Sequence, residues 1–544
     1  MNTLRDLLRQ PWLAICALAL TLVACDSGPQ PSASAPAASP APSVAAEPAR
    51  GSGAAFSVLA GSELKELESA LVAAAREIGI PLEVSYAGTL DIVERINAGE
   101  KFDAILPPNG AYPALALTKP PVAREKLFYS RVALGIKADV AQRLGWDSKV
   151  PTWADIARAA RDGQLRYAMT NPSSSNTGMS ALFAIASAAA GKTEDLTVAE
   201  IDAELLRGFL VGQKLTAGSS GWLADSFAQD DSAVDAIVNY EAVLLRLNRA
   251  RSTPLTLIYP QDGVISADYP LMLLDDSRRA DYDALVQHLK AGKFQGGPVR
   301  DAWLRPSNPD ISPDPALPVT AVAELAFPNQ LAVIDAVLTA YQGELRRPAT
   351  SIFVLDTSGS MRGERLDQLK EALVLLSGAR ASAASQRYAA FQTRERIVLL
   401  PFSGSVGKPE QIEYSQATLA ADQQRVIDYS GALRAQGQTA IYDALQRAIA
   451  LAEIENGGEG SNERFVSIVL LSDGENTAGT DFASFSRSPA LAALREARIR
   501  IFPILFGEAS QQEMQQLAEL TGGRMFDARS SELPLIFKEI RGYQ

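Results

Sequence analysis

The chain has 544 residues, more than the ~250–300 that one hydrophobic core accommodates, so two or three domains are expected. Its 63 acidic and 51 basic residues give a formal net charge of −12, and an acidic protein repels the phosphate backbones of nucleic acids. One histidine, His288, and two cysteines, Cys16 and Cys25, exclude a His/Cys zinc centre and a disulfide framework, and a Ser-His-Asp triad could use only His288.

The first 24 residues have the features of a secretory signal peptide. A basic stretch precedes an apolar run over 12–24, which is too short to cross a bilayer. The run closes with Leu22-Val23-Ala24-Cys25, which resembles the lipobox of bacterial lipoproteins. That resemblance implies removal of residues 1–24 and lipidation of Cys25; the alternative is an ordinary signal with a chance cysteine. Asp26 resembles an inner-membrane retention signal, which implies the periplasmic face of the inner membrane.

Residues 25–54 form the next segment, which consists mainly of Ser, Ala, Pro and Gly and has almost no large apolar side chain. Such a composition cannot offset the entropy of ordering by burial. We therefore expect a disordered tether between the lipidated cysteine and the folded part of the chain.

Residues 55–315 alternate between strand and helix patterns, which predicts an α/β domain. The first expected strands are 55–60, 82–86 and 102–106, and the first expected helices are 64–78 and one that starts at 92–96. A strand over 128–136 would cross into a second lobe, and the chain would return at about 255–275 to complete the first.

Polar loops follow the strands of this domain. They include Gly61-Ser62, Gly88-Thr89, the segment 107–110, and the segment 170–178 that precedes a helical run over 179–190. With Val238-Asn239-Tyr240-Glu241 later in the chain, this pattern is similar to that of extracellular solute-binding proteins that serve ABC transporters. The resemblance implies a bilobed, type 2 periplasmic-binding-protein-like fold with a cleft between the lobes.

The cleft ligand expected from these loops is an anion or a carboxylate-bearing solute, because helix N-termini present backbone N–H groups and the positive end of the helix dipole. The candidate contacts are Ser62, Thr89, Ser174, Asn176 and Thr177, with Tyr240 as a contact from the second lobe. Ser, Thr and Asn also favour N-caps and turns, so a purely structural role is the alternative.

A proline-rich stretch and a helix at about 329–342 make residues 316–347 a connector to a final module over 348–544. There the expected strands are 351–355, 396–400, 465–471 and 499–505, and the expected helices include 366–376, 440–452 and 511–520. The strands are apolar on both faces, which predicts a doubly wound, Rossmann-like module with helices on both sides of a mainly parallel sheet.

The clearest chemical signal is Asp356-Thr357-Ser358-Gly359-Ser360, directly after the first strand of this module. Thr439 precedes a helix, and Asp473 follows a buried strand, so further oxygen donors occur at equivalent places. Hydroxyl and carboxylate ligands suit Mg²⁺, Mn²⁺ or Ca²⁺ rather than Zn²⁺.

These motifs resemble the metal-ion-dependent adhesion site of the von Willebrand factor A (VWA) domain. They are the D-x-S-x-S run, the Thr439-Ala440-x-x-Asp443-Ala444 segment and Ser472-Asp473-Gly474. The resemblance implies Mg²⁺, with Mn²⁺ or Ca²⁺ as other candidates, and it implies a structural or indirect role for Asp443. The implied ligands are Asp356, Ser358, Ser360, Thr439 and Asp473. The alternatives are a Ser/Gly turn without an ion and a retained ion site without a partner.

The function expected from these features is that of a lipid-anchored envelope protein that is not an enzyme. The bilobed domain would bind a small solute or a partner, and the ion of the VWA domain would bridge to an acidic residue of another envelope protein. A rival hypothesis is transport, in which the chain delivers solute to an ABC permease and the VWA domain is a docking accessory.

Overall fold

A computed structural model describes residues 54–319, 321–380, 390–457, 464–507, 510–529 and 533–543. The expected signal peptide, lipidation site Cys25 and tether up to residue 53 lie outside the described residues. The described part of the chain forms three sheets, two in the first domain and one in the last module. None of the helices in these described ranges combines the length and the apolar character needed to span a membrane.

The first lobe is built on a five-stranded sheet with the order β2-β1-β3-β11-β4. Its strands are β1 (Phe56–Gly61), β2 (Leu82–Ala87), β3 (Ala104–Leu106), β4 (Ala123–Lys126) and β11 (Pro270–Leu273). β1 pairs in parallel with β2 and β3, and β11 is antiparallel to β3 and β4. Its helices are η1 (Ser62–Leu67), α1 (Glu68–Glu77), α2 (Thr89–Asn97), α3 (Ala111–Ala116), η3 (Asp276–Arg278), α10 (Arg279–Leu289), α11 (Gly292–Phe294) and η4 (Gln295–Val299). The helix expected over 64–78 is thus a 3₁₀ helix followed by α1.

The second lobe has a sheet with the order β10-β5-β8-β6-β7, to which β9 and β12 add by pairing with β5. Its strands are β5 (Phe128–Ile136), β6 (Tyr167–Ala168), β7 (Gln213–Leu215), β8 (Ala236–Tyr240), β9 (Thr256–Ile258), β10 (Ser266–Ala267) and β12 (Arg305–Pro306). Its helices are α4 (Ala138–Arg143), α5 (Trp153–Arg161), α6 (Asn176–Ala189), η2 (Val198–Glu200), α7 (Ala203–Leu210), α8 (Ser220–Gln229) and α9 (Glu241–Ala250).

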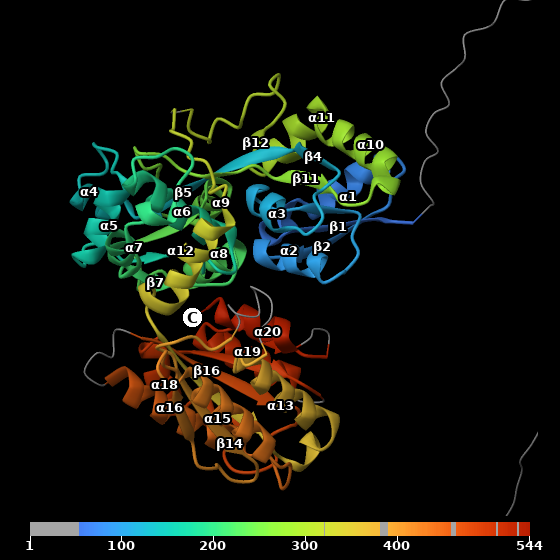
Figure 1. Ribbon diagram of the computed structural model, residues 1–544. Coiled ribbons are helices and arrows are strands. Elements are labelled where there is room, and N and C mark those ends of the chain that lie inside the picture. The colour runs from blue at the N-terminus through green and yellow to red at the C-terminus, as the bar shows by residue number, and fades with distance from the viewer. Residues whose placement is uncertain are drawn as a thin grey trace, which may run out of the picture. The chain divides into compact units, whose positions relative to one another are not determined.

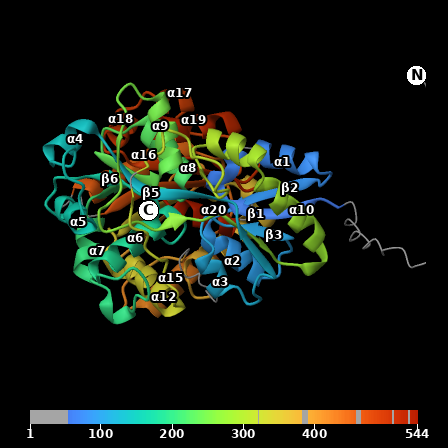
Figure 2. The ribbon, with the colours of Figure 1, turned by 90° about the horizontal axis from the view of Figure 1, so that it is seen from above.

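The chain passes between the lobes three times, the last time from η4 to β12. The chain enters the second lobe between β4 and β5 and returns between β10 and β11, so the crossing expected at 128–136 and the return at 255–275 are both present. Figure 2 shows α1, α2, α3 and α10 gathered around the first sheet and α4 to α9 around the second. This two-sheet architecture is the bilobed α/β fold that the sequence predicts.

The last module, which runs from orange to red in Figure 1, contains a six-stranded sheet. The strand order is β15-β14-β13-β16-β17-β18. Its strands are β13 (Ala349–Asp356), β14 (Arg396–Phe402), β15 (Glu410–Glu413), β16 (Phe465–Ser472), β17 (Arg500–Leu505) and β18 (Phe526–Asp527). Only β15, at one edge, is antiparallel to its neighbour. The helices are α12 (Leu331–Ala340) and η5 (Tyr341–Leu345) in the connector, then η6 (Gly359–Met361), α13 (Glu364–Leu376), α15 (Leu419–Ala432), α16 (Ile441–Gly457), α17 (Phe482–Phe485), α18 (Pro489–Glu496), α19 (Gln511–Thr521) and α20 (Leu533–Arg541).

Alternation along β13 explains why helices cover both faces of this sheet. Every residue of β13 is buried, and successive side chains point to opposite faces. Ile352 and Val354 belong to a core with residues of α16, α18 and α19, whereas Phe353 and Leu355 belong to a core with residues of α13, α15 and α20. The doubly wound arrangement predicted from the apolar strands is therefore confirmed.

Candidate functional site

The loop after β13 fixes the carboxylate of Asp356 at the carboxyl end of the sheet. Asp356 is fully buried, and its Oδ1 accepts a hydrogen bond from the backbone N–H of Ser358 at 2.8 Å. Its Oδ2 accepts from the hydroxyl of Ser472 at 2.6 Å. Ligand sites of open α/β sheets lie at this edge, so Asp356 is both held in place and well situated for a ligand.

The other four expected ligands converge on the same edge. The Oγ atoms of Ser358 and Ser360 lie 3.0 Å apart, and Ser360 Oγ donates to Asp473 Oδ1 at 2.8 Å. Thr439 precedes α16, and a methyl group built on Gly474 would lie 3.3 Å from Ser360 Oγ and 3.6 Å from Thr439 Oγ1. The structure therefore brings Asp356, Ser358, Ser360, Thr439 and Asp473 together.

The donor set fits a divalent cation. Burial raises the pKa of Asp356, and the nearby carboxylate of Asp473 adds to that rise, although hydrogen bonds from Ser472 and Ser358 oppose it. A cation placed among the hydroxyls would offset the cost of keeping both carboxylates ionised, and Gly474 leaves room beside them. The described residues contain no group of three His, Cys, Asp or Glu with metal-site geometry, so the fit depends on hydroxyls as well as carboxylates.

Two further residues shape this site. Arg365, on α13, places its Nη1 atom 2.5 Å from Asp473 Oδ2, so the carboxylate of Asp473 already forms an ion pair with an arginine side chain. Arg365 was not expected at this site, because a single arginine on a helix belongs to no motif. Asp443 accepts from the backbone N–H of Thr480 at 3.0 Å, which gives it a structural contact that fits its expected indirect role.

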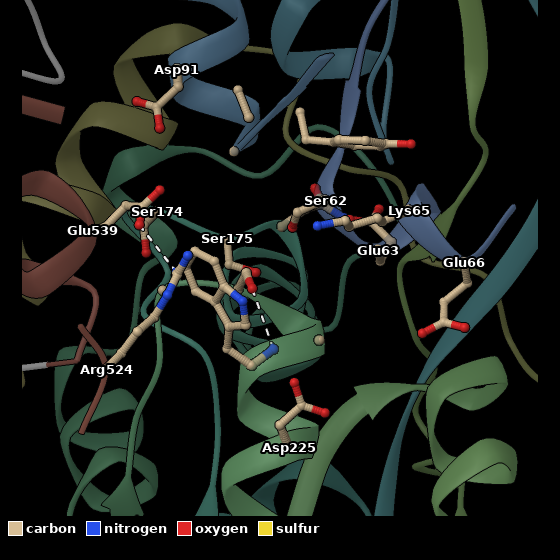
Figure 3. Close-up of a pocket in the computed structure, with 18 of the residues that line it drawn as sticks. Ser62, Glu63, Lys65, Glu66, Asp91, Ser174, Ser175, Asp225, Arg524 and Glu539 are labelled. Carbon is tan, nitrogen blue, oxygen red and sulfur yellow. Dashed lines mark hydrogen bonds and ion pairs between the residues drawn. The ribbon is translucent and has the colours of Figure 1, made fainter. Parts of the chain in front are cut away.

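A second candidate site is a cavity of about 710 Å³ (Figure 3). Its polar lining includes Ser62 from the first lobe and Ser174 and Asn176 from the second, which are three of the six contacts expected from the sequence. The start of α6 faces this cavity, as the polar segment 170–178 predicts.

Thr89, Thr177 and Tyr240 are placed outside the lining of this cavity. Thr177 is fully buried, with its hydroxyl 2.9 Å from that of Thr170 and 2.7 Å from that of Ser220. The Tyr240 hydroxyl accepts from Asn176 Nδ2 at 3.0 Å, and Thr89 is 1% exposed at the start of α2. Thr177 and Tyr240 thus support the cleft wall from behind.

The two lobes touch at the cleft. A Cβ built on Gly88 would lie 2.3 Å from the carbonyl oxygen of Ser174, closer than real atoms approach. Only glycine allows this approach of a first-lobe loop to a second-lobe loop. The structure therefore has the lobes in contact beside a cavity that is partly open to solvent.

The charged lining of the cavity is mixed rather than cationic. The acidic members are Glu63, Glu66, Asp91, Asp225 and Glu539, and the basic members are Lys65, Arg95, Arg246 and Arg524. Burial raises the pKa of Glu63 to about 7 and also raises the pKa values of Asp225 and Glu539. The α6 N-terminus alone favours an anion, but the charges around it do not.

Arg524 and Glu539 belong to the last module, not to either lobe of the first domain. Nothing in the sequence connects them with the cleft, because more than 300 residues separate them from Ser174 and Ser175, which lie beside them in Figure 3. Polar residues of this kind in a loop and on a helix give no pattern of their own.

These sites and sheets define the classes of domain in the chain. Residues 56–296 match the family model described as bacterial extracellular solute-binding protein, and residues 352–539 match that of the von Willebrand factor type A domain. The chain therefore contains a solute-binding domain followed by a VWA domain, as the sequence motifs indicate. VWA domains commonly bind a divalent metal at their adhesion site.

The curated relatives are similar to the VWA part alone. Inter-alpha-trypsin inhibitor heavy chain H4 of Sus scrofa is 31% identical over 193 residues, which are 35% of this chain and 19% of that protein. The human heavy chain H4 is 29% identical over 190 residues, which are 34% of this chain and 18% of that protein. The match thus spans about a fifth of the length of these relatives.

Solved structures show likeness to each part separately. The periplasmic binding protein P5PA has a TM-score of 0.42 at 13% identity, over 54% of this chain and 99% of its own. The binding protein AfuA from Actinobacillus pleuropneumoniae, bound to fructose-6-phosphate, has a TM-score of 0.41 at 13% identity, over 54% and 98%. A von Willebrand factor type A protein from Catenulispora acidiphila has a TM-score of 0.28 at 16% identity, over 36% and 42%.

Proposed function

We propose that this protein is a lipid-anchored envelope protein that captures a protein partner through Mg²⁺ in its VWA domain and binds a small solute in its bilobed domain. The observation that carries the first part is the convergence of five oxygen donors at one sheet edge. The cavity between two touching lobes supports the second part.

Asp356, Ser358, Ser360, Thr439 and Asp473 would hold the ion, directly or through water. A bound Mg²⁺ would supply a Lewis-acidic centre to which a partner's carboxylate could bind. The chain's own contribution is to orient the donors: Ser472 and the Ser358 N–H hold Asp356, and Ser360 and Arg365 hold Asp473. Mn²⁺ and Ca²⁺ suit the same oxygen donors.

The substitution Asp356→Ala tests metal-dependent capture. We expect Mg²⁺ affinity, measured by calorimetry on the mature protein, to fall at least about tenfold, since even indirect partners of metal ligands affect affinity by that much. Retention of envelope proteins on the immobilised chain should disappear with this variant and on adding EDTA. Asp367→Ala, an exposed acid on α13, is the control. Capture that is equal with and without EDTA contradicts the proposal.

The proposal gives no catalytic role to the chain. His288 lines neither site, and its Nε2 atom lies 3.3 Å from Glu77 Oε2 on the first lobe. The predicted anchor at Cys25 would hold both domains at the periplasmic face of the inner membrane. Delivery of solute to a permease is the second candidate function, because a cavity lined by both lobes would suit it.

A further inference from the structure

One wall of the solute cleft comes from the VWA domain. Arg524 lies in the loop between α19 and β18 of that domain. Its guanidinium carbon is 3.5 Å from the centre of the Trp222 ring on α8. Arg524 Nη1 also lies 3.2 Å from Glu539 Oε2 on α20. All three side chains line the cavity, so the ion pair and the indole form one continuous surface.

This wall is anchored by close backbone contact between the two domains. A Cβ built on Gly542 would lie 2.4 Å from the Cα of Gly218, which leaves no space for a side chain at the junction. Asn171 Nδ2 donates to the carbonyl of Arg541 at 3.2 Å. The Tyr543 ring stacks on Trp222 with centroids 6.3 Å apart and an interplanar angle of 17°. The C-terminal segment is therefore fixed against the second lobe.

Two hydrogen-bond acceptors in the lining have no donor among the described residues. Asn176 is 3% exposed; its Nδ2 donates to Tyr240 and Ser180, but its Oδ1 has no partner. Glu63 is partly exposed, but its Oε1 atom is buried and has no partner. Buried acceptors without donors are costly, so a ligand with N–H groups would relieve both.

The charges of the lining favour the same kind of ligand. Five carboxyl groups line the cavity against four basic side chains, and Arg95 bonds Glu100 outside it, with Nε 2.6 Å from Glu100 Oε2. Figure 3 shows Glu63 and Glu66 across the cavity from Glu539, with Asp225 below them. A cation between these carboxyl groups would be attracted from several sides.

We propose that the cleft is a composite site, walled partly by Arg524 and Glu539 of the VWA domain, whose ligand is a small organic amine in its ammonium form. The inference rests on the proposed solute-binding role and specifies it. The ammonium donates to Glu63 Oε1 and Asn176 Oδ1, and Glu539 supplies a carboxylate from the opposite wall. Binding then requires the VWA domain to be in place.

The test uses the full mature chain and four named amines: putrescine, spermidine, histamine and L-lysine. Choline, a cation without N–H donors, and citrate, an anion, are the comparison probes. Binding is followed by calorimetry and by the fluorescence of Trp222, identified by its absence in Trp222→Phe. We expect at least one amine to bind more tightly than choline and citrate.

Substitutions on opposite sides of the cavity then measure how much each wall contributes to amine binding. Glu539→Gln and Glu63→Gln should each weaken amine binding by about ten- to a hundredfold, the worth of a hydrogen bond to a charged group. Glu519→Gln, an exposed residue of α19, is the matched control. Unchanged affinity in Glu539→Gln, with a loss in Glu63→Gln, overturns the composite wall. Citrate or choline binding in preference to the amines overturns the ligand class, and no binding of any probe overturns the proposed solute role as well.

Discussion

The buried ion cluster around Glu395 offers the sharpest test of how the VWA domain is held together. Glu395 is 1% exposed, and Arg541 Nη2 lies 2.5 and 2.6 Å from its two carboxylate oxygens. Arg346 of the connector bonds the same carboxylate. Glu395→Gln keeps the size of the side chain but leaves two buried guanidinium groups without their counter-charge.

The expected cost is about 3–5 kcal/mol, the usual penalty for removing one partner of a buried ion pair. For a domain of this size each kcal/mol lowers the melting temperature by about 2–4 °C, so the VWA transition should fall by about 6–20 °C. Calorimetry of the full chain measures it, and hydrogen exchange of α20 amides identifies which domain melts. Glu413→Gln is the control, because Glu413 is an exposed partner of Arg396 and should change little.

The pH dependence sharpens this test. Burial alone would raise the pKa of Glu395, but Arg541 and Arg346 outweigh it and hold the pKa below its ordinary value. A carboxyl with a depressed pKa contributes stability above its unfolded pKa and loses it as the pH falls through the folded value. The difference in melting temperature between the wild type and Glu395→Gln should therefore become smaller at acidic pH. A variant that melts within 2 °C of wild type at pH 7 would refute the reasoning.

Two further changes probe the two sites. Gly474→Ala places a methyl group 3.3 Å from Ser360 Oγ and 3.6 Å from Thr439 Oγ1, so the Mg²⁺ affinity measured by calorimetry should fall about tenfold. The control Gly431→Ala, on the open surface of α15, should leave this affinity unchanged. Equal affinities of the two variants would place the ion elsewhere. Burial raises the pKa of Glu63 from 4.5 to about 7, so the stabilising contribution of this side chain is complete below pH 4.5. This contribution is lost as the pH rises from 4.5 to about 7, and the loss is at most about 3 kcal/mol. The free energy of unfolding of Glu63→Gln, measured with denaturant, should not show this loss between pH 4.5 and 7. The same dependence of unfolding free energy on pH in the variant and the wild type would contradict the raised pKa of Glu63.

The convergence of the five expected ion ligands was predictable because most of these residues lie at or near the ends of strands. Asp356 ends β13, and Asp473 directly follows β16. These strands are adjacent and parallel, so the two carboxylates lie at the same sheet edge. The motif spacing then identifies the hydroxyl donors. Arg365 lies a short way along α13, and nothing in its neighbours in sequence indicates that it turns back to Asp473.

The cleft was only partly predictable, for two physical reasons. The sequence predicts the helical run from residue 179, whereas α6 starts three residues earlier, at Asn176. Each residue of a helix turns the side-chain direction by about 100° around the axis, so Asn176 faces the cavity while Thr177 faces the core. Contacts between domains have no local signature. Arg524 and Glu539 reach the cavity through the packing of α20 and the junction at Gly218 and Gly542, which depends on the folded surfaces.

The loop 171–175 connects these features. Its Ser174 carbonyl meets Gly88 of the first lobe, Asn171 bonds Arg541 of the VWA domain, and Ser173 is bonded by Gln342 of the connector. Opening the lobes and detaching the VWA domain therefore both remove contacts from the same five residues. If these shared contacts couple the two movements, the coupling is reciprocal: closing the cleft would favour docking of the VWA domain by the same free energy as docking favours closure. The tight approach at Gly88 and the buried cluster at Glu395, which fixes the end of α20, are the two places where that coupling would be strengthened or broken.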